Sequence, residues 1–229
     1  MSKRLMTISL AVAVAGAAGW WFTQPSSTST PTVAGQEIAL PGAANAQESG
    51  SGANVEVQEM VLGSADAPVE VIEYASYTCP HCANFHKGVF KDLKADYIDT
   101  GKVKFVYREV YFDRYGLWGS MIARCGGDSR FFGVTDILYE QQSSWSRAGS
   151  EAAIADELRK IGRVAGLEAD QLEACLSDGD KARSLIEWYQ ANAQEHGINS
   201  TPSFVIDGTT YSNMSYSEFR EILDERLGS

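Results

Sequence analysis

The chain has 229 residues, of which 44% are hydrophobic and 21% charged, a composition typical of a folded protein that excludes a wholly disordered one. The formal net charge is −11 at pH 7, and residues 1–53 hold only two basic and two acidic residues, so the rest of the chain carries the whole imbalance. This charge argues against nucleic acid or an anionic membrane surface as a partner, and we interpret it as favouring solubility.

The N-terminus has the pattern of an export segment. Lys3 and Arg4 precede an apolar run over residues 5–22, which is long enough either for a secretory signal or for a membrane-spanning anchor. A candidate cleavage site at 44–46 lies far beyond this run, so a cleaved signal and a retained anchor both stay open. No lipobox cysteine is present, which argues against a lipid anchor. In either case we expect the remainder to be exported.

Residues 23–53 are dominated by Ser, Thr, Gly, Ala, Pro and Gln and show no sustained apolar period. Such a segment cannot bury a core, so it is predicted to be a flexible linker.

The next part of the chain predicts a βαβ unit. Residues 55–61 alternate weakly and indicate a first strand, and 69–75 are β-branched and aromatic, which favours a buried strand. A helix is predicted over 80–99, and the alternation over 102–111 predicts the following strand. Because a helix links the last two strands, we expect them to be parallel.

A long helical stretch follows, and the sheet then resumes. The helix predicted over 150–165 has apolar residues at helical spacing along one face. The sheet returns with a strand over 202–206, a turn at Asp207-Gly208 and a strand over 209–211, and residues 216–227 predict a closing helix. The expected helices of the stretch are 116–125, 129–141, 150–165, 168–177 and 180–195, and the apolar face is that of Ala153, Ala155, Leu158, Ile161 and Val164.

The motif Cys79-Pro80-His81-Cys82 lies where the strand over 69–75 gives way to a helix. This position is typical of a redox-active dithiol. At a helix N-terminus, unpaired N–H groups and the positive end of the helix dipole stabilise a thiolate. Pro80 suits the first helical turn, and His81 can add a hydrogen bond or a positive charge near the sulfur. Cys82, one turn further on, is expected to be the buried thiol.

Half of a zinc site is the alternative interpretation of two cysteines at this spacing. A structural zinc ion usually takes four protein ligands in two pairs. The other cysteines, Cys125 and Cys175, are solitary, and no second Cys-x-x-Cys exists. We therefore favour redox chemistry and predict no metal site. His86 and His196 are expected to be unrelated to the chemistry.

Three features together resemble the DsbA-type thiol–disulfide oxidoreductases. They are the run Glu73 to Cys82 (EYASYTCPHC), the run Asn199 to Phe204 (NSTPSF), and the position of the helical stretch. The resemblance implies a thioredoxin-like α/β fold with an inserted all-helical domain. It assigns residues 54–113 and 196–229 to the thioredoxin-like domain and 114–195 to the insertion.

The resemblance also implies roles for individual residues. Cys79 resembles the family's nucleophile and Cys82 its resolving thiol. Pro202 resembles the family's cis-proline, and the backbone of Thr201 would pair with a substrate peptide. Threonine stands here where many strong oxidases of the family carry valine.

A buried acidic residue of the family matches Glu73. That residue exchanges protons with the resolving thiol, and burial raises a carboxyl pKa toward the range such exchange needs. Cys125 and Cys175 are expected to form a structural disulfide, as in some family members, with two buried free thiols as the alternative.

The function implied is oxidation of exported proteins by dithiol–disulfide exchange in the periplasm, with no cofactor beyond the redox-active disulfide. Expected partners are unfolded exported substrates and a quinone-linked membrane reoxidant of the DsbB type, and the protein is expected to be a monomer. Alternatives are an isomerase or reductase, a metal- or substrate-holding module without turnover, and an oxidoreductase dedicated to one pathway.

Overall fold

The computed structural model describes residues 32–33, 36–37 and 55–228. The predicted export segment 5–22, the cleavage site 44–46 and most of the linker therefore lie outside the described residues. Within the linker, β1 (Thr32–Val33) and β2 (Gln36–Glu37) form a short antiparallel pair. In the part of the chain that the structure describes, the helices all fall short of the length and apolarity needed to cross a bilayer.

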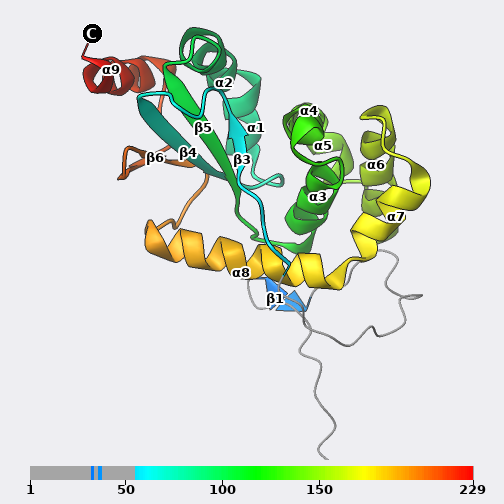
Figure 1. Cartoon of the computed structure of the whole chain (residues 1–229). Coiled ribbons are helices and arrows are strands. Elements are labelled where there is room, and N and C mark those ends of the chain that lie inside the picture. Colours follow the sequence, from blue (N-terminus) through cyan, green and yellow to red (C-terminus); the bar gives the residue numbers. More distant parts are fainter. Residues whose placement is uncertain (1–31, 34–35, 38–54, 229) are drawn as a thin grey trace, which may run out of the picture.

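A five-stranded sheet organises the rest of the chain (Figure 1). Its strands lie in the order β3-β5-β4-β6-β7, and β4 and β5 pair in parallel, as the βαβ pattern predicts. The other three pairings are antiparallel. The strands are β3 (Met60–Leu62), β4 (Val69–Ala75), β5 (Val103–Glu109), β6 (Ser203–Ile206) and β7 (Thr209–Ser212).

The central strand β4 is buried on both faces, which explains its nearly continuous apolar sequence. On one face, Ile72 and Tyr74 belong to a cluster that Tyr189 of α8 (Gly179–Glu195) covers. On the other, Val71 packs in a cluster with Phe85 of α1 (Pro80–Lys87) and with α9 (Tyr216–Leu227). Because side chains alternate along a strand, Glu73 faces the same side as Val71, toward α1.

The predicted insertion forms a helical unit beside the sheet, and Figure 1 shows α8 running past both. Its apolar core, which includes Phe131 and Leu158, is continuous with the cluster under α1. This arrangement confirms the α/β class with an inserted helical domain. The helices before α8 are α3 (Arg114–Cys125), α4 (Asp128–Glu140), α5 (Gln142–Trp145), α6 (Glu151–Val164) and α7 (Ala169–Ser177).

The single helix predicted over 80–99 is wrong in one respect, because the chain breaks at Gly88. There φ is −123° and ψ is −95°, outside the helical region. The Gly88 N–H still bonds to the carbonyls of Asn84 and Phe85, which closes α1. The chain continues as α2 (Val89–Leu93) and a π-helical turn, η2 (Lys94–Ile98).

The first predicted strand is shorter than expected, because only Met60–Leu62 pairs in the sheet. Side chains of the insertion satisfy the preceding backbone instead. The Val55 N–H donates to Ser184 Oγ at 2.9 Å, and Arg124 Nη1 donates to the Gln58 carbonyl at 2.8 Å. Residues 55–59 therefore run against α3 and α8 rather than forming a ladder.

The apolar face predicted for 150–165 is wrong at one position. Ala155, Leu158 and Ile161 are buried, but Val164 is 71% exposed. Ile154 takes its place, since it lies at i, i+4 and i+7 spacing with Leu158 and Ile161, whereas Val164 lies about 80° around the helix from Ile154.

A buried ion pair fixes α3 against the sheet. Arg124 Nε and Nη2 donate to the two carboxylate oxygens of Glu109, each at 2.6 Å, at the end of β5. Ser120 adds a third hydrogen bond to the same carboxylate at 2.8 Å. This bidentate pairing holds the insertion next to the end of β5.

Candidate active site

Cys79 lies where the chain turns from β4 into α1. Its backbone is extended, with φ −79° and ψ 119°, and it is the N-cap residue of α1. The Cys79 N–H bonds to the Ser76 carbonyl at 3.0 Å, which fixes the turn after the strand. Pro80 occupies the first helical turn, where a missing N–H costs no intrahelical bond. The sulfur is thus placed at the positive end of α1.

Hydrogen bonds to the Cys79 sulfur favour its thiolate form over the thiol. A hydrogen bond from the Cys82 thiol lowers the pKa of Cys79 to about 5, against the burial that raises it. The Thr201 side chain and the backbone N–H groups of Cys82 and His81 lower the pKa further. The His81 ring itself is exposed, so this residue contributes through its amide.

Cys82 has the opposite character. Its side chain is fully buried, and burial raises the pKa of the Cys82 thiol far above its ordinary value. The hydrogen bond to Cys79 and the charge of Glu73 raise it further. Both residues are free thiols in this structure. The pair therefore combines an accessible thiolate with a buried thiol that keeps its proton.

The loop before β6 closes over the Cys79 sulfur. The Thr201–Pro202 peptide bond is cis, and Cys79 Sγ lies 3.4 Å from the Thr201 carbonyl oxygen, to which the thiol donates. Antiparallel pairing of β6 with β4 places Ser203 opposite Tyr74. The register of the sheet thus brings two segments 122 residues apart in sequence to the same sulfur.

Glu73 lies beneath the dithiol on β4 with no exposed surface. Burial raises the pKa of its carboxyl, and the neighbouring His86 opposes that rise. His86 Nε2 is 2.8 Å from Glu73 Oε2, and the imidazole stacks on Tyr139 with centroids 4.3 Å apart. His86, expected to be unrelated to the chemistry, thus lies in contact with Glu73. His196 instead contacts the Tyr74 hydroxyl, at 2.6 Å.

One residue of the insertion and one residue just before it brace the active-site turn, and sequence reasoning missed both. Gln142 Nε2 donates to the carbonyls of Tyr77 and Cys79, at 2.9 and 2.8 Å. Asp113 accepts a hydrogen bond from Thr78 Oγ1 at 2.7 Å while capping α3. An N-cap pattern before α3 signals Asp113 as a cap, but no local pattern marks Gln142.

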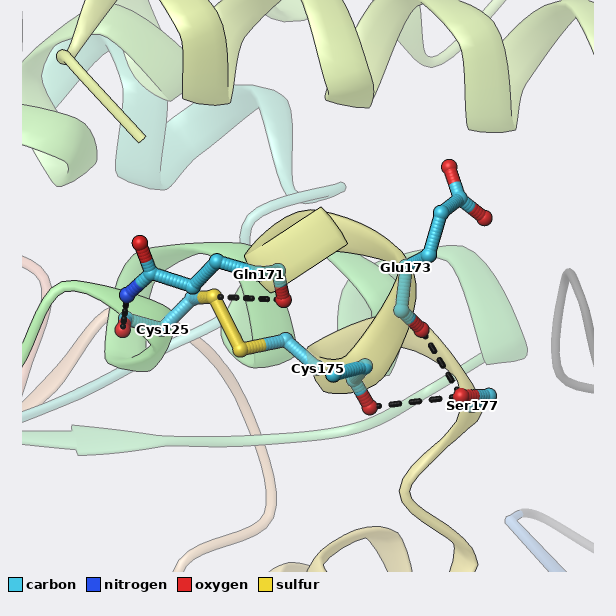
Figure 2. Close-up of a disulfide and its surroundings, with 6 residues drawn as sticks. Cys125, Gln171, Glu173, Cys175 and Ser177 are labelled. Atoms are coloured by element: carbon cyan, nitrogen blue, oxygen red, sulfur yellow. Dashed lines mark hydrogen bonds between the residues drawn. A yellow bond between two sulfur atoms is a disulfide. The ribbon is translucent and has the colours of Figure 1, made fainter. Parts of the chain in front are cut away.

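Cys125 and Cys175 form a disulfide between α3 and α7, with their Cα atoms 5.8 Å apart (Figure 2). Gln171 of α7 donates to the Cys125 carbonyl at 2.9 Å, so a hydrogen bond runs beside the covalent link. Over the residues that the structure describes, His, Cys, Asp and Glu side chains form no cluster of three or more suited to a metal ion.

A thioredoxin-type sheet with a dithiol at a helix N-terminus defines the class of this protein. A family model described as thioredoxin matches residues 55–225, and the chain belongs to that family. Its structural neighbours make it a DsbA-like member. The crystal structure of Wolbachia pipientis alpha-DsbA1 aligns with a TM-score of 0.68 and 26% identity, covering 74% of this chain and 91% of that one.

Proteins similar in sequence to this chain carry names that refer to disulfide chemistry. A protein of Rickettsia bellii, provisionally named a protein-disulfide oxidoreductase, is 34% identical over 174 residues, or 76% of this chain and 66% of that protein. Disulfide bond formation protein D of Bacillus subtilis is 29% identical over 177 residues, or 73% and 76% of the two chains. The chain thus spans just under two thirds of the Rickettsia relative.

Proposed function

We propose that the protein is a thiol–disulfide oxidoreductase that introduces disulfides into exported proteins. The observation that carries this proposal is the opposite perturbation of the two thiol pKa values. With a pKa of about 5, Cys79 is about 99% thiolate at pH 7. Stabilising the reduced thiolate favours reduction of the disulfide, so the oxidised protein is a strong acceptor of electrons from substrate thiols.

The reaction follows from which sulfur is accessible. In the oxidised protein, a substrate thiolate attacks Cys79 Sγ, and the electron pair of the broken bond goes to Cys82. Glu73, whose raised pKa keeps a proton available, protonates the departing Cys82 thiolate. A second substrate thiolate then attacks the substrate sulfur of the mixed disulfide. Cys79 leaves as the thiolate that its surroundings stabilise.

Substrate binding and reoxidation complete the proposal. An unfolded chain would lie across Cys79 and the Thr201–Pro202 loop, where the Thr201 backbone would pair with it as a strand does. A quinone-linked membrane partner of the DsbB type would return the dithiol to the disulfide. The site would be periplasmic, with residues 5–22 serving as a cleaved signal or as a tether. The protein would act as a monomer and would need no cofactor besides its own disulfide.

The test is the redox potential of the Cys79–Cys82 pair in glutathione buffers, measured beside a C125S/C175S variant so that only one disulfide titrates. A potential of about −120 mV, the value for oxidising DsbA, supports the proposal. A potential of about −270 mV, the value for thioredoxin, indicates a reductase.

Isomerases also occur at the oxidising end of this range. A second assay therefore compares oxidation of a reduced, unfolded substrate with repair of a scrambled one. Faster oxidation supports the oxidase, and faster repair supports the isomerase alternative. Thiol turnover that persists in chelator excludes the metal-holding alternative.

A further inference from the structure

The buried pair Cys82 and Glu73 poses a proton-supply problem. Both side chains are fully buried. If Glu73 gives its proton to Cys82 in every turnover, the carboxylate has to regain one from solvent that it does not touch. A third group must link it to the surface.

His86 is placed to be that group. It lies one helical turn after Cys82, so both side chains project from the same face of α1. Its Nε2 is 2.8 Å from Glu73 Oε2, and its side chain is almost completely buried. The stack on Tyr139 and an edge contact with Tyr107, with centroids 5.8 Å apart, fix the plane of the ring.

The second ring nitrogen of His86, Nδ1, makes no hydrogen bond to the described residues. Nδ1 is buried and, within the described part of the chain, has no hydrogen-bond partner; the same holds for Glu73 Oε1. Buried polar atoms in folded proteins are nearly always paired, so these two unpaired atoms call for an explanation.

A cavity of about 190 Å³ lies beside His86, between α1, α2 and α4. A water molecule needs about 10–15 Å³ of such space, so the cavity has room for several. Its lining includes His86, Lys87, Lys91, Lys94, Asp136 and Glu140. These charged groups share the lining with the rings of Phe90 and Tyr139, and they offer hydrogen-bond partners to water in the cavity.

The titratable groups that pack against Glu73 and His86 come from β5 and α4. Tyr107 of β5 and Tyr139 of α4 face Glu73, and burial raises the pKa of both hydroxyls well above the ordinary value. Asp136 of α4 faces the cavity, and burial raises the pKa of its carboxyl while His86 opposes the rise. The tyrosines therefore stay protonated at neutral pH, whereas a neutral imidazole can accept a proton at one ring nitrogen while it donates one from the other.

We propose that His86 conducts protons between this cavity and Glu73, and that it thereby supplies the proton that Cys82 gains on reduction and removes it on oxidation. This inference rests on the proposed function. When the active-site disulfide is reduced, Cys82 takes the Glu73 proton. Glu73 regains one from His86 Nε2 as Nδ1 takes one from cavity water. Reoxidation by the DsbB-type partner reverses each transfer, so the imidazole returns to its starting tautomer and no proton is left over.

The experiment measures how fast the oxidised full-length protein is reduced by dithiothreitol, followed by tryptophan fluorescence from pH 5 to 9 in H₂O and D₂O. His86→Ala should slow reduction about a hundredfold at neutral pH, the size of a general acid–base contribution. Added imidazole should restore the rate through the enlarged cavity. Glu73→Gln should be slowed similarly but should not respond to imidazole, since the relay is then broken on the inner side.

Two further variants separate proton conduction from positioning. His86→Gln keeps a hydrogen-bond donor beside Glu73 but cannot relay protons, so it should stay slow. His196→Gln, a histidine change on the opposite face of the sheet, should match the wild type. If His86→Gln is reduced at the wild-type rate, or if added imidazole does not raise the reduction rate of His86→Ala, the proposal that His86 conducts protons is wrong. A wild-type protein that exchanges no thiols would overturn the proposed function instead.

Discussion

Replacing Thr201 by valine tests how the active site stabilises its thiolate. The Thr201 hydroxyl is buried and, among the described residues, has no hydrogen-bond partner while Cys79 is a thiol; its donation to the Cys79 thiolate lowers the pKa of Cys79. Valine has a similar shape, and its introduction deprives no other group of a partner. The substitution therefore removes one donor to the sulfur and leaves the backbone carbonyl contact at 3.4 Å in place.

The expected change is large enough to measure. A hydrogen bond to a charged group contributes about 1.5–3 kcal/mol, and about 1.4 kcal/mol corresponds to one pKa unit. The pKa of Cys79 should therefore rise from about 5 to about 6–7. Because the reduced state loses that stabilisation, the redox potential should fall by about 30–60 mV, toward the reducing end.

The assay is the ultraviolet absorbance of the thiolate in the reduced protein as a function of pH, paired with the potential in glutathione buffers. Thr210→Val is the matched control, since that hydroxyl is exposed and donates to the His196 carbonyl. A Thr201→Val protein with an unchanged or lowered Cys79 pKa would refute the reasoning, because the hydroxyl would then not stabilise the thiolate.

Three other predictions concern stability. The depressed pKa of Cys79 stabilises the folded reduced protein above the ordinary thiol pKa, and this contribution is lost as the pH falls from about 9 through about 5. In urea titrations, the unfolding free energy of the reduced form minus that of the oxidised form should therefore decrease as the pH falls over this range. A difference that does not change with pH would contradict the lowered pKa of Cys79. A C125S/C175S variant should lose about 4 kcal/mol, because the bond closes a sequence separation of 50 residues. Urea unfolding checks this, with unchanged dithiothreitol reactivity of Cys79 as the sign that the site is intact. Arg124→Met should cost about 3–5 kcal/mol by the same assay, since it leaves the buried Glu109 carboxylate without its counter-ion. A loss below about 1 kcal/mol would show that Glu109 accommodates the change.

Much of the fold was accessible from the sequence because its signals are local. The apolar run of β4, the alternation of β5 and the apolar spacing of the later helices are properties of neighbouring residues. They predicted the βαβ unit and the long helical stretch, which the family resemblance identified as an insertion. One error arose where distant contacts took over, and another where the backbone at a glycine left the helical conformation. Residues 55–59 are bound by side chains of α3 and α8, and the backbone at Gly88 closes one helix before the next begins.

The sequence by itself determined that two cysteines lie at the start of a helix, because four consecutive residues after a strand are enough to place them there. That position alone favours a thiolate at Cys79. Only the tertiary structure decided what surrounds the sulfurs. Sheet register brings Thr201 to Cys79, the insertion brings Gln142 to the same turn, and helix packing buries Cys82 and Glu73 beside His86. These contacts depend on how separate elements pack, and no spacing along the chain encodes them.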